Sequence, residues 1–353
     1  MMTMLQAVSG AFSGHMEEYA GAQTPASFGD VRAEYSALRQ GCGISFQNWR
    51  TKIGLRGSDR VRWLNGMITN NIRDLAAGRG VYSFLLNAQG RILGDLHAYN
   101  LGDRLIIDTD QSQRDKIVST FDHFIIMDDV EIEGLRQNIA SVGVAGPKSK
   151  DILARVFSAV PALEPLQVAE VAFQNNPVRL VRGGDPAYEE FELWIAPEHE
   201  NTLWNALVEA GATRVGSQAV ELHRITRGIP RYGVDLRERD LPQETEQFRA
   251  LNFNKGCYVG QEIVERIRSR GNVHRTFTGF RIHGPVPPAG AKIVSEGKEV
   301  GEVTSTAELP VIGVPVVALG YIRREAIATN RPFTINGIPA AASSLPFTDL
   351  PNA

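Results

Sequence analysis

The stretch Lys255-Gly-Cys-Tyr-Val-Gly-Gln-Glu262 holds one of only two cysteines in a chain of 353 residues. It is followed by apolar residues at helical spacing, namely Ile263, Val264 and Ile267. The sequence therefore predicts that Cys257 lies in a glycine-hinged loop immediately before a helix. A helix N-terminus and a neighbouring lysine both favour the thiolate form of a cysteine, and several arginines follow. Cys257 is therefore a candidate reactive thiol.

A second interpretation of Cys257 stays open, because free cysteine is among the most buried residue types and often acts as a small hydrophobe. The stretch is not a phosphate-binding loop, since it lacks the Gly-Lys-Ser/Thr ending that such a loop requires. It is not a metal site by itself either, because Cys42 is remote in sequence. We therefore predict no metal.

The composition is that of an ordinary soluble globular protein, with 43% hydrophobic and 22% charged residues. A net charge of -3 gives no bulk electrostatic reason to expect a nucleic-acid partner. Glu17 and Glu18 stand where a signal or transit peptide avoids acids, and no apolar run is long enough to span a membrane. Two cysteines suit a reducing compartment. We expect a cytoplasmic protein with a poorly ordered arm over residues 1–26.

Short strands and helices alternate over most of the chain, which favours an α+β fold with helices on one face of a sheet. After Arg275, glycine and proline separate short alternating runs, as is typical of a small β-barrel, so we expect a domain boundary near residue 276. Strands are expected at residues 51–56, 81–86, 92–99, 104–108, 130–135, 139–144, 178–182 and 191–195. Helices are expected at 33–39, after an N-cap at Ser58, at 111–124, from Pro147 onward, at 199–210 and at 218–226.

With these residues in place, the chain resembles the tetrahydrofolate-dependent aminomethyltransferase (T-protein) superfamily. It resembles more closely the YgfZ-type folate-binding protein family, the branch linked to iron–sulfur cluster assembly and repair. The stretch 255–262, followed by Arg270-Gly271, marks that branch. The wider resemblance runs from about Gln40 to the C-terminus and includes Gly90-Arg-Ile-Leu-Gly-Asp95 and Gly146-Pro147.

The resemblance implies an α+β fold: a three-domain ring of the aminomethyltransferase type with a ferredoxin-like inserted unit and a C-terminal β-barrel. The first domain would combine residues 27–50 and 140–235. The ferredoxin-like domain would combine residues 51–139 and 236–275 and carry the cysteine motif. The barrel would cover residues 276–353.

The resemblance also implies a folate site. Glu192 matches the glutamate that recognises the pterin, and one carboxylate can accept two hydrogen bonds from the ring N–H and the adjacent amino group. Arg224 matches a folate-contacting arginine, Tyr82 a position near the pterin, and Asp108 a folate-contacting asparagine. These four residues would bind tetrahydrofolate or a derivative. Without the resemblance, Glu192 would be an outward strand residue, Arg224 a helix-surface charge and Tyr82 a core residue.

Two residues are candidates for the chemistry itself. Asp95 matches an aspartate beside the reacting nitrogen of tetrahydrofolate, where a carboxylate could orient or exchange a proton. Cys257 is the candidate thiol. The motif residues counted with the site are Lys255, Gly256, Cys257, Tyr258, Gly260, Gln261 and Glu262.

Several transferase residues are replaced, so the resemblance leaves open whether the chain is an enzyme. Where the aminomethyltransferases have an Asp-Asp pair, this chain has Gly94-Asp95. Where they have an Asp-Val-Ser-His-Met run, it has Phe46-Gln-Asn-Trp-Arg50, and their Gly-Tyr-Thr-Gly-Glu loop is replaced by Arg182-Gly-Gly-Asp-Pro186.

Three functions follow as hypotheses. The leading one is a folate-binding accessory factor, acting through Cys257, whose partners are iron–sulfur cluster proteins or their assembly machinery. The first alternative is a tetrahydrofolate-dependent aminomethyltransferase or methyltransferase that uses Asp95. The second alternative is a folate-regulated interaction module that needs Glu192 and Arg224 but not Cys257.

Overall fold

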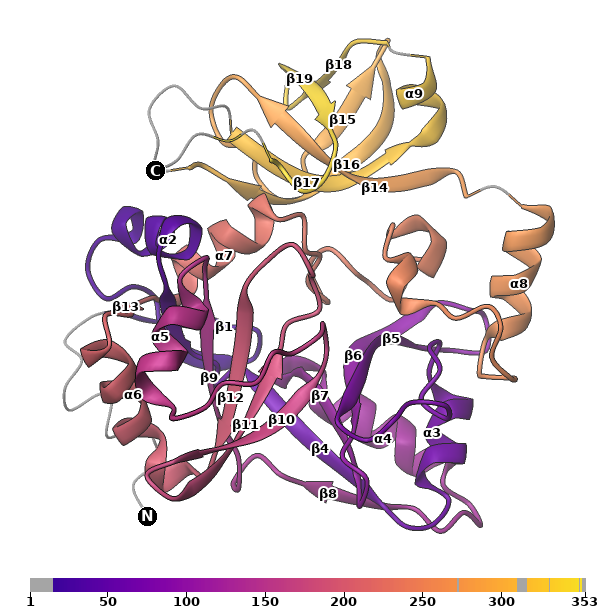
Figure 1. The fold of residues 1–353 in the computed structure, drawn as a ribbon. Helices are drawn as coiled ribbons and strands as arrows, with labels where there is room; N and C mark the ends of the chain where they lie inside the picture. The colour runs from indigo at the N-terminus through magenta and orange to yellow at the C-terminus, as the bar shows by residue number, and fades with distance from the viewer. Residues whose placement is uncertain (1–14, 272, 310–315, 330, 349, 351–353) are drawn as a thin grey trace. The chain divides into compact units, whose positions relative to one another are not determined.

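The computed structural model describes residues 15–271, 273–309, 316–329, 331–348 and 350 (Figure 1). The chain divides into two compact units. Unit 1 combines residues 1–64, 72–82 and 96–220, and unit 2 combines residues 65–71, 83–95 and 221–353. Each unit is therefore assembled from segments that are far apart in sequence.

A six-stranded sheet forms one half of unit 1. Its neighbouring strands are antiparallel, except that the last strand joins its neighbour in parallel. The order is β10 (Val168–Phe173), β11 (Asn176–Arg182), β12 (Glu190–Ile195), β9 (Ala140–Ala145), β3 (Gly43–Phe46) and β13 (Thr213–Arg214). Three helices of this unit are α2 (Val31–Gln40), α5 (Ser149–Val156) and α6 (Glu200–Glu209). The core between sheet and helices contains Ile44, Val142, Leu180, Leu193, Leu153, Leu203 and Leu207.

A second sheet has five strands. Its order is β5 (Arg79–Leu86), β6 (Ile92–Asn100), β7 (Leu105–Asp110), β4 (Arg50–Arg56) and β8 (Glu131–Gly134). The accompanying helices are α3 (Arg60–Met67) and α4 (Arg114–Phe124), the latter preceded by the 3-10 turn η1 (Gln111–Gln113). Strand β4 is buried along Thr51 to Leu55, so it forms an interior strand of the sheet.

The two sheets pack on one another within unit 1. Tyr99 and Ile106 of the five-stranded sheet share a buried cluster with Val181 and Trp194 of the six-stranded sheet. The rings of Tyr99 and Trp194 meet edge to face at a centroid distance of 5.4 Å. This packing brings the face of β4 and β7 against β12, and the candidate site lies there.

Unit 2 contains a closed six-stranded barrel, as the sequence predicts. The order is β14 (Arg275–Ile282), β17 (Val316–Arg323), β16 (Lys298–Ala307), β15 (Lys292–Ser295), β18 (Phe333–Ile335) and β19 (Ile338–Ser343), and β19 pairs back with β14. Its core includes Phe280, Ile293, Val303 and Ile335. The remaining elements in this part of the chain are α7 (Ser217–Thr226), η3 (Pro242–Glu244), η4 (Phe248–Ala250), α8 (Gln261–Arg270) and α9 (Arg324–Ala328).

The expected flexible arm is wrong for residues 16–25. They form a hairpin of β1 (Met16–Tyr19) and β2 (Ala22–Pro25), and residues 1–14 lie outside the described residues. The hairpin is held because Tyr19 is buried and packs edge-on against Trp49 at a centroid distance of 5.1 Å. A four-residue strand is too short to show as an apolar run in the sequence.

Two helix starts also differ from the expectation. Ser58 is not an N-cap, because its hydroxyl donates to Asp129 Oδ2 at 2.8 Å and α3 begins only at Arg60. Pro147 precedes α5 by two residues rather than opening it. The expected helices at 33–39, 199–210 and 218–226 are confirmed within two residues, and so is the strand pair around residues 87–90.

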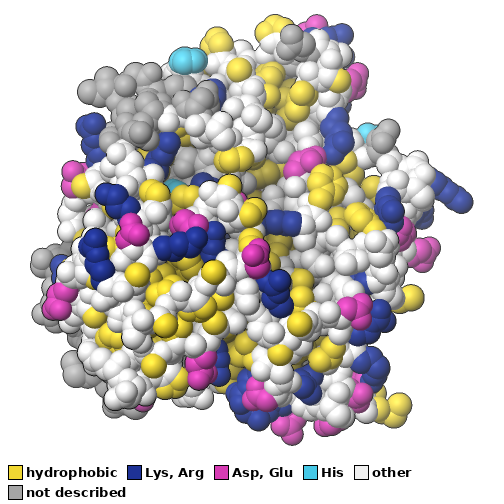
Figure 2. Space-filling view, viewed as in Figure 1, with side chains coloured by type: hydrophobic (Ala, Val, Ile, Leu, Met, Phe, Trp, Pro, Cys, Tyr) yellow, Lys and Arg dark blue, Asp and Glu magenta, His cyan; other side chains and the backbone are white. Residues whose placement is uncertain are grey.

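The surface drawn in Figure 2 carries basic and acidic side chains interspersed with hydrophobic ones, as the small net charge leads one to expect. Among the described residues, no helix combines the length and the apolar character needed to span a membrane.

Candidate functional site

Three strands of unit 1 bring together a cluster of charged side chains. Arg50 and Lys52 are two residues apart on β4, so they point to the same side of the sheet. In the antiparallel register, Lys52 lies opposite Asp108 of β7 and Arg50 lies opposite Asp110. Glu192 of β12 reaches the same cluster from the six-stranded sheet.

Lys52 is at the centre of this cluster. Its ammonium donates to Asp108 Oδ1 at 2.7 Å and to Glu192 Oε1 at 2.6 Å, and the side chain is 1% exposed. The ammonium also lies 5.0 Å from the centroid of the Trp194 ring, which adds a cation–π contact. A charge this deeply buried requires close opposite charges, and Lys52 has two of them.

Asp108 is fully engaged by its two cationic neighbours. Arg50 donates to Asp108 from Nη2 at 2.7 Å and from Nε at 3.2 Å, while its Nη1 contacts Asp110 at 2.7 Å. Burial alone would raise the pKa of Asp108, but Arg50 and Lys52 outweigh it and hold that pKa well below its usual range. Both carboxylate oxygens of Asp108 are occupied by Arg50 and Lys52, and a folate contact by Asp108 stays a prediction.

Glu192 differs from Asp108 because only one of its two carboxylate oxygens accepts a hydrogen bond. Its Oε1 accepts from Lys52, whereas its Oε2 has no hydrogen-bond partner among the residues that the structure describes. The side chain is 13% exposed, so a ligand can approach it. This open oxygen can accept a hydrogen bond from a ring N–H or an amino group.

Tyr82 and His97 lie on neighbouring strands of the five-stranded sheet. Their rings are tilted at a centroid distance of 5.1 Å, and Tyr82 is buried. His97 adds a smaller contribution to the lowering of the pKa of Asp108, after Arg50 and Lys52. Asp95 stands two residues before His97 on β6 and is half-buried. Its role as the catalytic carboxylate stays a prediction.

The structure places Arg224 in a buried network of unit 2. Its guanidinium donates to Asp235 Oδ2 at 2.7 Å, to both carboxylate oxygens of Glu221 at 2.6 and 2.9 Å, and to Ser305 Oγ at 2.9 Å. It also donates to the carbonyl of Ile229 at 2.6 Å. These contacts join α7 to β16 of the barrel, and a folate contact by Arg224 stays a prediction.

The loop before α8 has the geometry that the sequence predicts. Helix α8 begins at Gln261, and Gly260 at its N-cap has φ +81°, in the left-handed region that glycine adopts readily. A Cβ at Gly260 would also lie 2.5 Å from the carbonyl oxygen of Asn87. Cys257 is exposed, so the interpretation as a buried hydrophobe is wrong.

The sequence predicts that Lys255 favours the thiolate form of Cys257, but in the structure its side chain contacts backbone carbonyls instead. It is buried, and its ammonium donates to the carbonyl oxygens of Asn65, Ile68 and Asn70 at 2.5, 2.6 and 2.8 Å. The lysine therefore caps the backbone at the C-terminal end of α3. Gln261 holds the loop as well, because its side-chain oxygen accepts from the backbone N–H of Tyr258. The other motif residues lie around them: Gly256 and Cys257 in the loop, Glu262 in the first turn of α8.

Sequence reasoning missed Lys52 and Arg50. Two cations two residues apart on a mostly buried strand are the signal that could have found them, because both must then find anions on one face. Among the described residues, no three histidine, cysteine or acidic side chains are grouped to hold a metal ion.

Comparison with known proteins identifies the family. The GCVT N-terminal domain model matches residues 5–255, and the glycine cleavage T-protein C-terminal barrel domain model matches residues 275–349. The chain therefore belongs to the glycine cleavage T-protein superfamily. Among solved structures, the aminomethyltransferase T of the glycine cleavage system from Bartonella henselae matches with a TM-score of 0.85 and 21% identity, covering 98% of this chain and 97% of that one. This likeness establishes the aminomethyltransferase-type fold.

Curated relatives are similar over most of their length. The chain is 29% identical to an aminomethyltransferase of Streptomyces coelicolor, covering 91% of this chain and 88% of that protein. It is 26% identical to an aminomethyltransferase of Rubrobacter xylanophilus, covering 96% and 91%. It is 26% identical to a putative chloroplastic transferase of Arabidopsis thaliana, covering 84% and 69%.

These relatives overturn the leading hypothesis from the sequence. An iron–sulfur accessory factor working through Cys257 is contradicted, because full-length similarity leads to aminomethyltransferases. The inference relied on one short motif, and the structure shows that its lysine caps a helix. The first alternative, a transferase, agrees with the comparisons.

Proposed function

We propose that the chain is a tetrahydrofolate-dependent transferase of the aminomethyltransferase type. The observation that carries the proposal is the contact pattern of Glu192. Its Oε1 accepts a hydrogen bond from Lys52 at 2.6 Å, whereas its Oε2 has no hydrogen-bond partner among the described residues. A half-buried, oriented carboxylate with one free oxygen suits an N–H donor of a pterin ring. The similarity to aminomethyltransferases over most of the chain supports the same reaction class.

The residues present fit one edge of a pterin. Glu192 would accept one hydrogen bond from the ring, and Tyr82, which is buried against His97 on the five-stranded sheet, would hold that imidazole beside the pterin. Bound tetrahydrofolate would supply the nitrogen that accepts the one-carbon unit. Arg50 and Lys52 neutralise Asp108, so an aspartate at this position does not repel an anionic ligand.

Asp95 is the proposed proton-handling residue. It is a half-buried carboxylate on β6, and its spacing from His97 places both on one side of the strand. A carboxylate positioned by a rigid strand can orient the accepting amine and take up its proton. This chemistry does not require Cys257, which is exposed in the loop before α8.

The cysteine motif supports a place in the YgfZ-type branch of the superfamily. It is an argument about the descent of the chain and not about its activity. Two free cysteines, one of them exposed, suit a reducing compartment such as the cytoplasm.

The test is turnover by the purified chain. We expect it to transfer the one-carbon unit from an aminomethyl-lipoyl donor to tetrahydrofolate. Asp95→Asn should lower kcat by about 100-fold or more, the usual contribution of a proton-transfer group. Asp122→Asn, at an exposed position of α4, is the matched control. Folate binding without turnover would sink the transferase proposal in favour of a binding-only role.

A further inference from the structure

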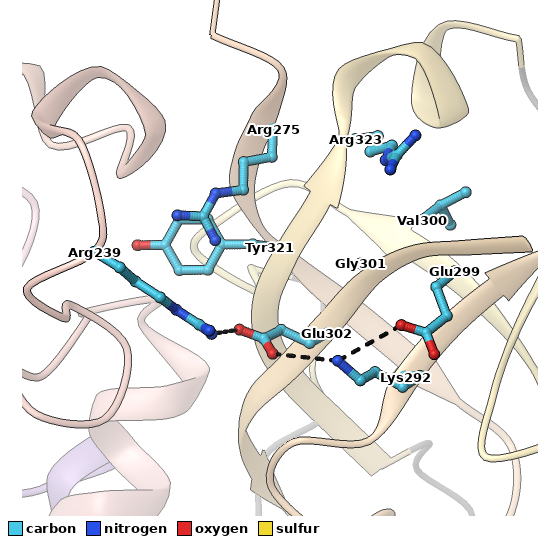
Figure 3. Close-up of a pocket in the computed structure, with 9 residues that line it drawn as sticks. All are labelled: Arg239, Arg275, Lys292, Glu299, Val300, Gly301, Glu302, Tyr321 and Arg323. Atoms are coloured by element: carbon cyan, nitrogen blue, oxygen red, sulfur yellow. Dashed lines mark hydrogen bonds and ion pairs between the residues drawn. The ribbon is translucent and has the colours of Figure 1, made fainter.

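We propose that a pocket on the barrel of unit 2 binds a small molecule carrying two or more carboxylates. The pocket has a volume of about 420 Å³, and its lining includes Arg239, Arg275, Lys292, Glu302, Tyr321 and Arg323 (Figure 3). This volume lies within the range of small-molecule sites. The inference is independent of the proposed transferase function, because all of its residues belong to unit 2.

The lining has an excess of positive charge. Four cationic side chains face two glutamates, Glu299 and Glu302. Lys292 lies 3.7 and 3.8 Å from these carboxylates, so it is not held in a short contact with either. Such a lining favours an anion.

Glu302 does not neutralise the remaining cations, because arginines already occupy it. Its Oε1 accepts from Arg237 Nη2 at 2.6 Å and from Arg239 Nη2. Burial would raise the pKa of Glu302, but Arg237 and Arg239 outweigh it and lower that pKa, so the carboxylate stays ionised. Figure 3 shows the guanidinium of Arg239 directed at Glu302, with the contact between them drawn as a dashed line.

Arg275 is a preorganised donor. Its Nε contacts Glu244 Oε1 at 3.0 Å, its Nη2 contacts Asp240 Oδ1 at 2.7 Å, and the guanidinium lies 4.7 Å from the centroid of the Tyr321 ring. These contacts fix the plane of the group. Its Nη1 has no hydrogen-bond partner in the described part of the chain, so this nitrogen can donate to a ligand without reorganisation.

Arg323 supplies the reason to expect an anion. It stands directly opposite Arg275 in the antiparallel register of β14 and β17. Like charges directly opposite each other destabilise a sheet. Asp240 and Glu244 compensate Arg275, but no described residue forms an ion pair with Arg323. An anion bound in the pocket would offset the repulsion.

The donors suit carboxylates, and because a guanidinium binds phosphate with the same two-oxygen geometry, the experiment compares the two anions. Guanidinium groups match the planar, two-oxygen geometry of a carboxylate. The available donors come from three strands, Arg275 on β14, Arg323 opposite it on β17 and Lys292 on β15, so a ligand with more than one carboxylate can satisfy them together.

Calorimetric titration of the full-length chain tests the proposal, with citrate as the probe and inorganic phosphate as the second arm. We expect saturable citrate binding that Arg323→Gln weakens about tenfold or more, as for loss of a charge-assisted contact. Arg331→Gln is the matched control, because Arg331 is an exposed barrel arginine that pairs with Glu296 and lies outside the pocket lining. The control should bind citrate like the unmodified chain.

Three results would overturn the proposal. The first is no saturable binding of citrate. The second is equal citrate affinity in the Arg323→Gln variant and the unmodified chain. The third is binding of phosphate alone, which would show that the pocket selects a different anion. Thermal unfolding of Arg323→Gln should occur at or above the temperature of the unmodified chain, because Arg323 is exposed and its removal relieves the repulsion with Arg275, and this separates a binding defect from a folding defect.

Discussion

The ammonium of Lys52 lies 2.6 Å from Oε1 of Glu192, and this contact joins β4 of the five-stranded sheet to β12 of the six-stranded sheet. The lysine is 1% exposed, so the contact is made in an environment where an unpaired charge is costly. It also leaves one oxygen of Glu192 open. The same pair therefore joins the two sheets of unit 1 and leaves Oε2 of Glu192 as the acceptor that we propose for a ligand.

Lys52→Met should strongly destabilise unit 1. The substitution keeps the volume of the side chain but leaves Asp108 and Glu192 without their shared cation, and breaking a buried pair costs about 3–5 kcal/mol. Urea unfolding measures the change. Lys150→Met removes a surface pair with Glu189 instead, and should cost about 1 kcal/mol or less. Equal losses in the two variants would show that the buried cluster carries no special stability.

Glu192→Gln should weaken binding of tetrahydrofolate about tenfold or more. The amide that replaces the carboxylate is a weaker acceptor, and it also loses its charge-assisted contact with Lys52. Fluorescence titration of the purified chain measures the affinity. Glu170→Gln, at an exposed position of β10 with only a long contact to Arg179, should bind as the unmodified chain does. Unchanged affinity in Glu192→Gln would remove Glu192 from the site.

The sequence predicts the elements of this fold better than its charged cluster. The barrel, the loop before α8 and helices such as α6 follow from periodicity and from glycine and proline positions, which are local signals. The partnership of Lys52 with Glu192 spans 140 positions in sequence and two different sheets. No local pattern encodes it, because it depends on how the sheets pack through Tyr99 and Trp194.

The motif around Cys257 illustrates the same limit. Spacing places the cysteine in its loop, but the direction of the Lys255 side chain depends on where α3 ends, 190 positions away. The resemblance to a family branch indicates that the lysine matters without giving its contacts. Its physical role emerges only when the carbonyls of Asn65 and Ile68 are brought beside it.

Stability should fall as the pH rises from about 5 to 8, in part because of Glu200. Burial raises the pKa of Glu200 to about 8, and its Oε2 is buried without a hydrogen-bond partner among the described residues. The folded chain therefore keeps a proton that the unfolded chain loses above pH of about 4.5, so folding becomes less favourable until about pH 8.

Glu200→Gln should remove this dependence. At pH 8.5 the variant should be more stable than the unmodified chain by on the order of 1–3 kcal/mol, and at pH 5 the two should differ little. Urea unfolding at both pH values measures this. Glu198→Gln, an exposed change in the preceding turn, should leave the pH dependence as it was. A pH profile that Glu200→Gln does not alter would contradict the argument.

The two cysteines should react very differently with an alkylating reagent. Cys257 is exposed, whereas Cys42 is 4% exposed and burial raises the pKa of its thiol to about 11. At neutral pH the folded chain should take up one label, at Cys257, and a second only in denaturant. Mass spectrometry of digested protein locates the labels. Cys257→Ser should abolish native labelling, and labelling of Cys42 in the folded chain would show that unit 1 opens there.

Lys255→Met should destabilise unit 2 by about 2–3 kcal/mol. The ammonium donates to three backbone carbonyls, and a methionine of similar length leaves them without a donor in a buried place. Urea unfolding gives the loss. The exposed neighbour provides the control, since Cys257→Ser removes no contact of comparable burial and should change stability by about 0.5 kcal/mol or less. If Lys255→Met unfolds at the same urea concentration as Cys257→Ser, the three contacts of the lysine with backbone carbonyls do not stabilise the end of α3.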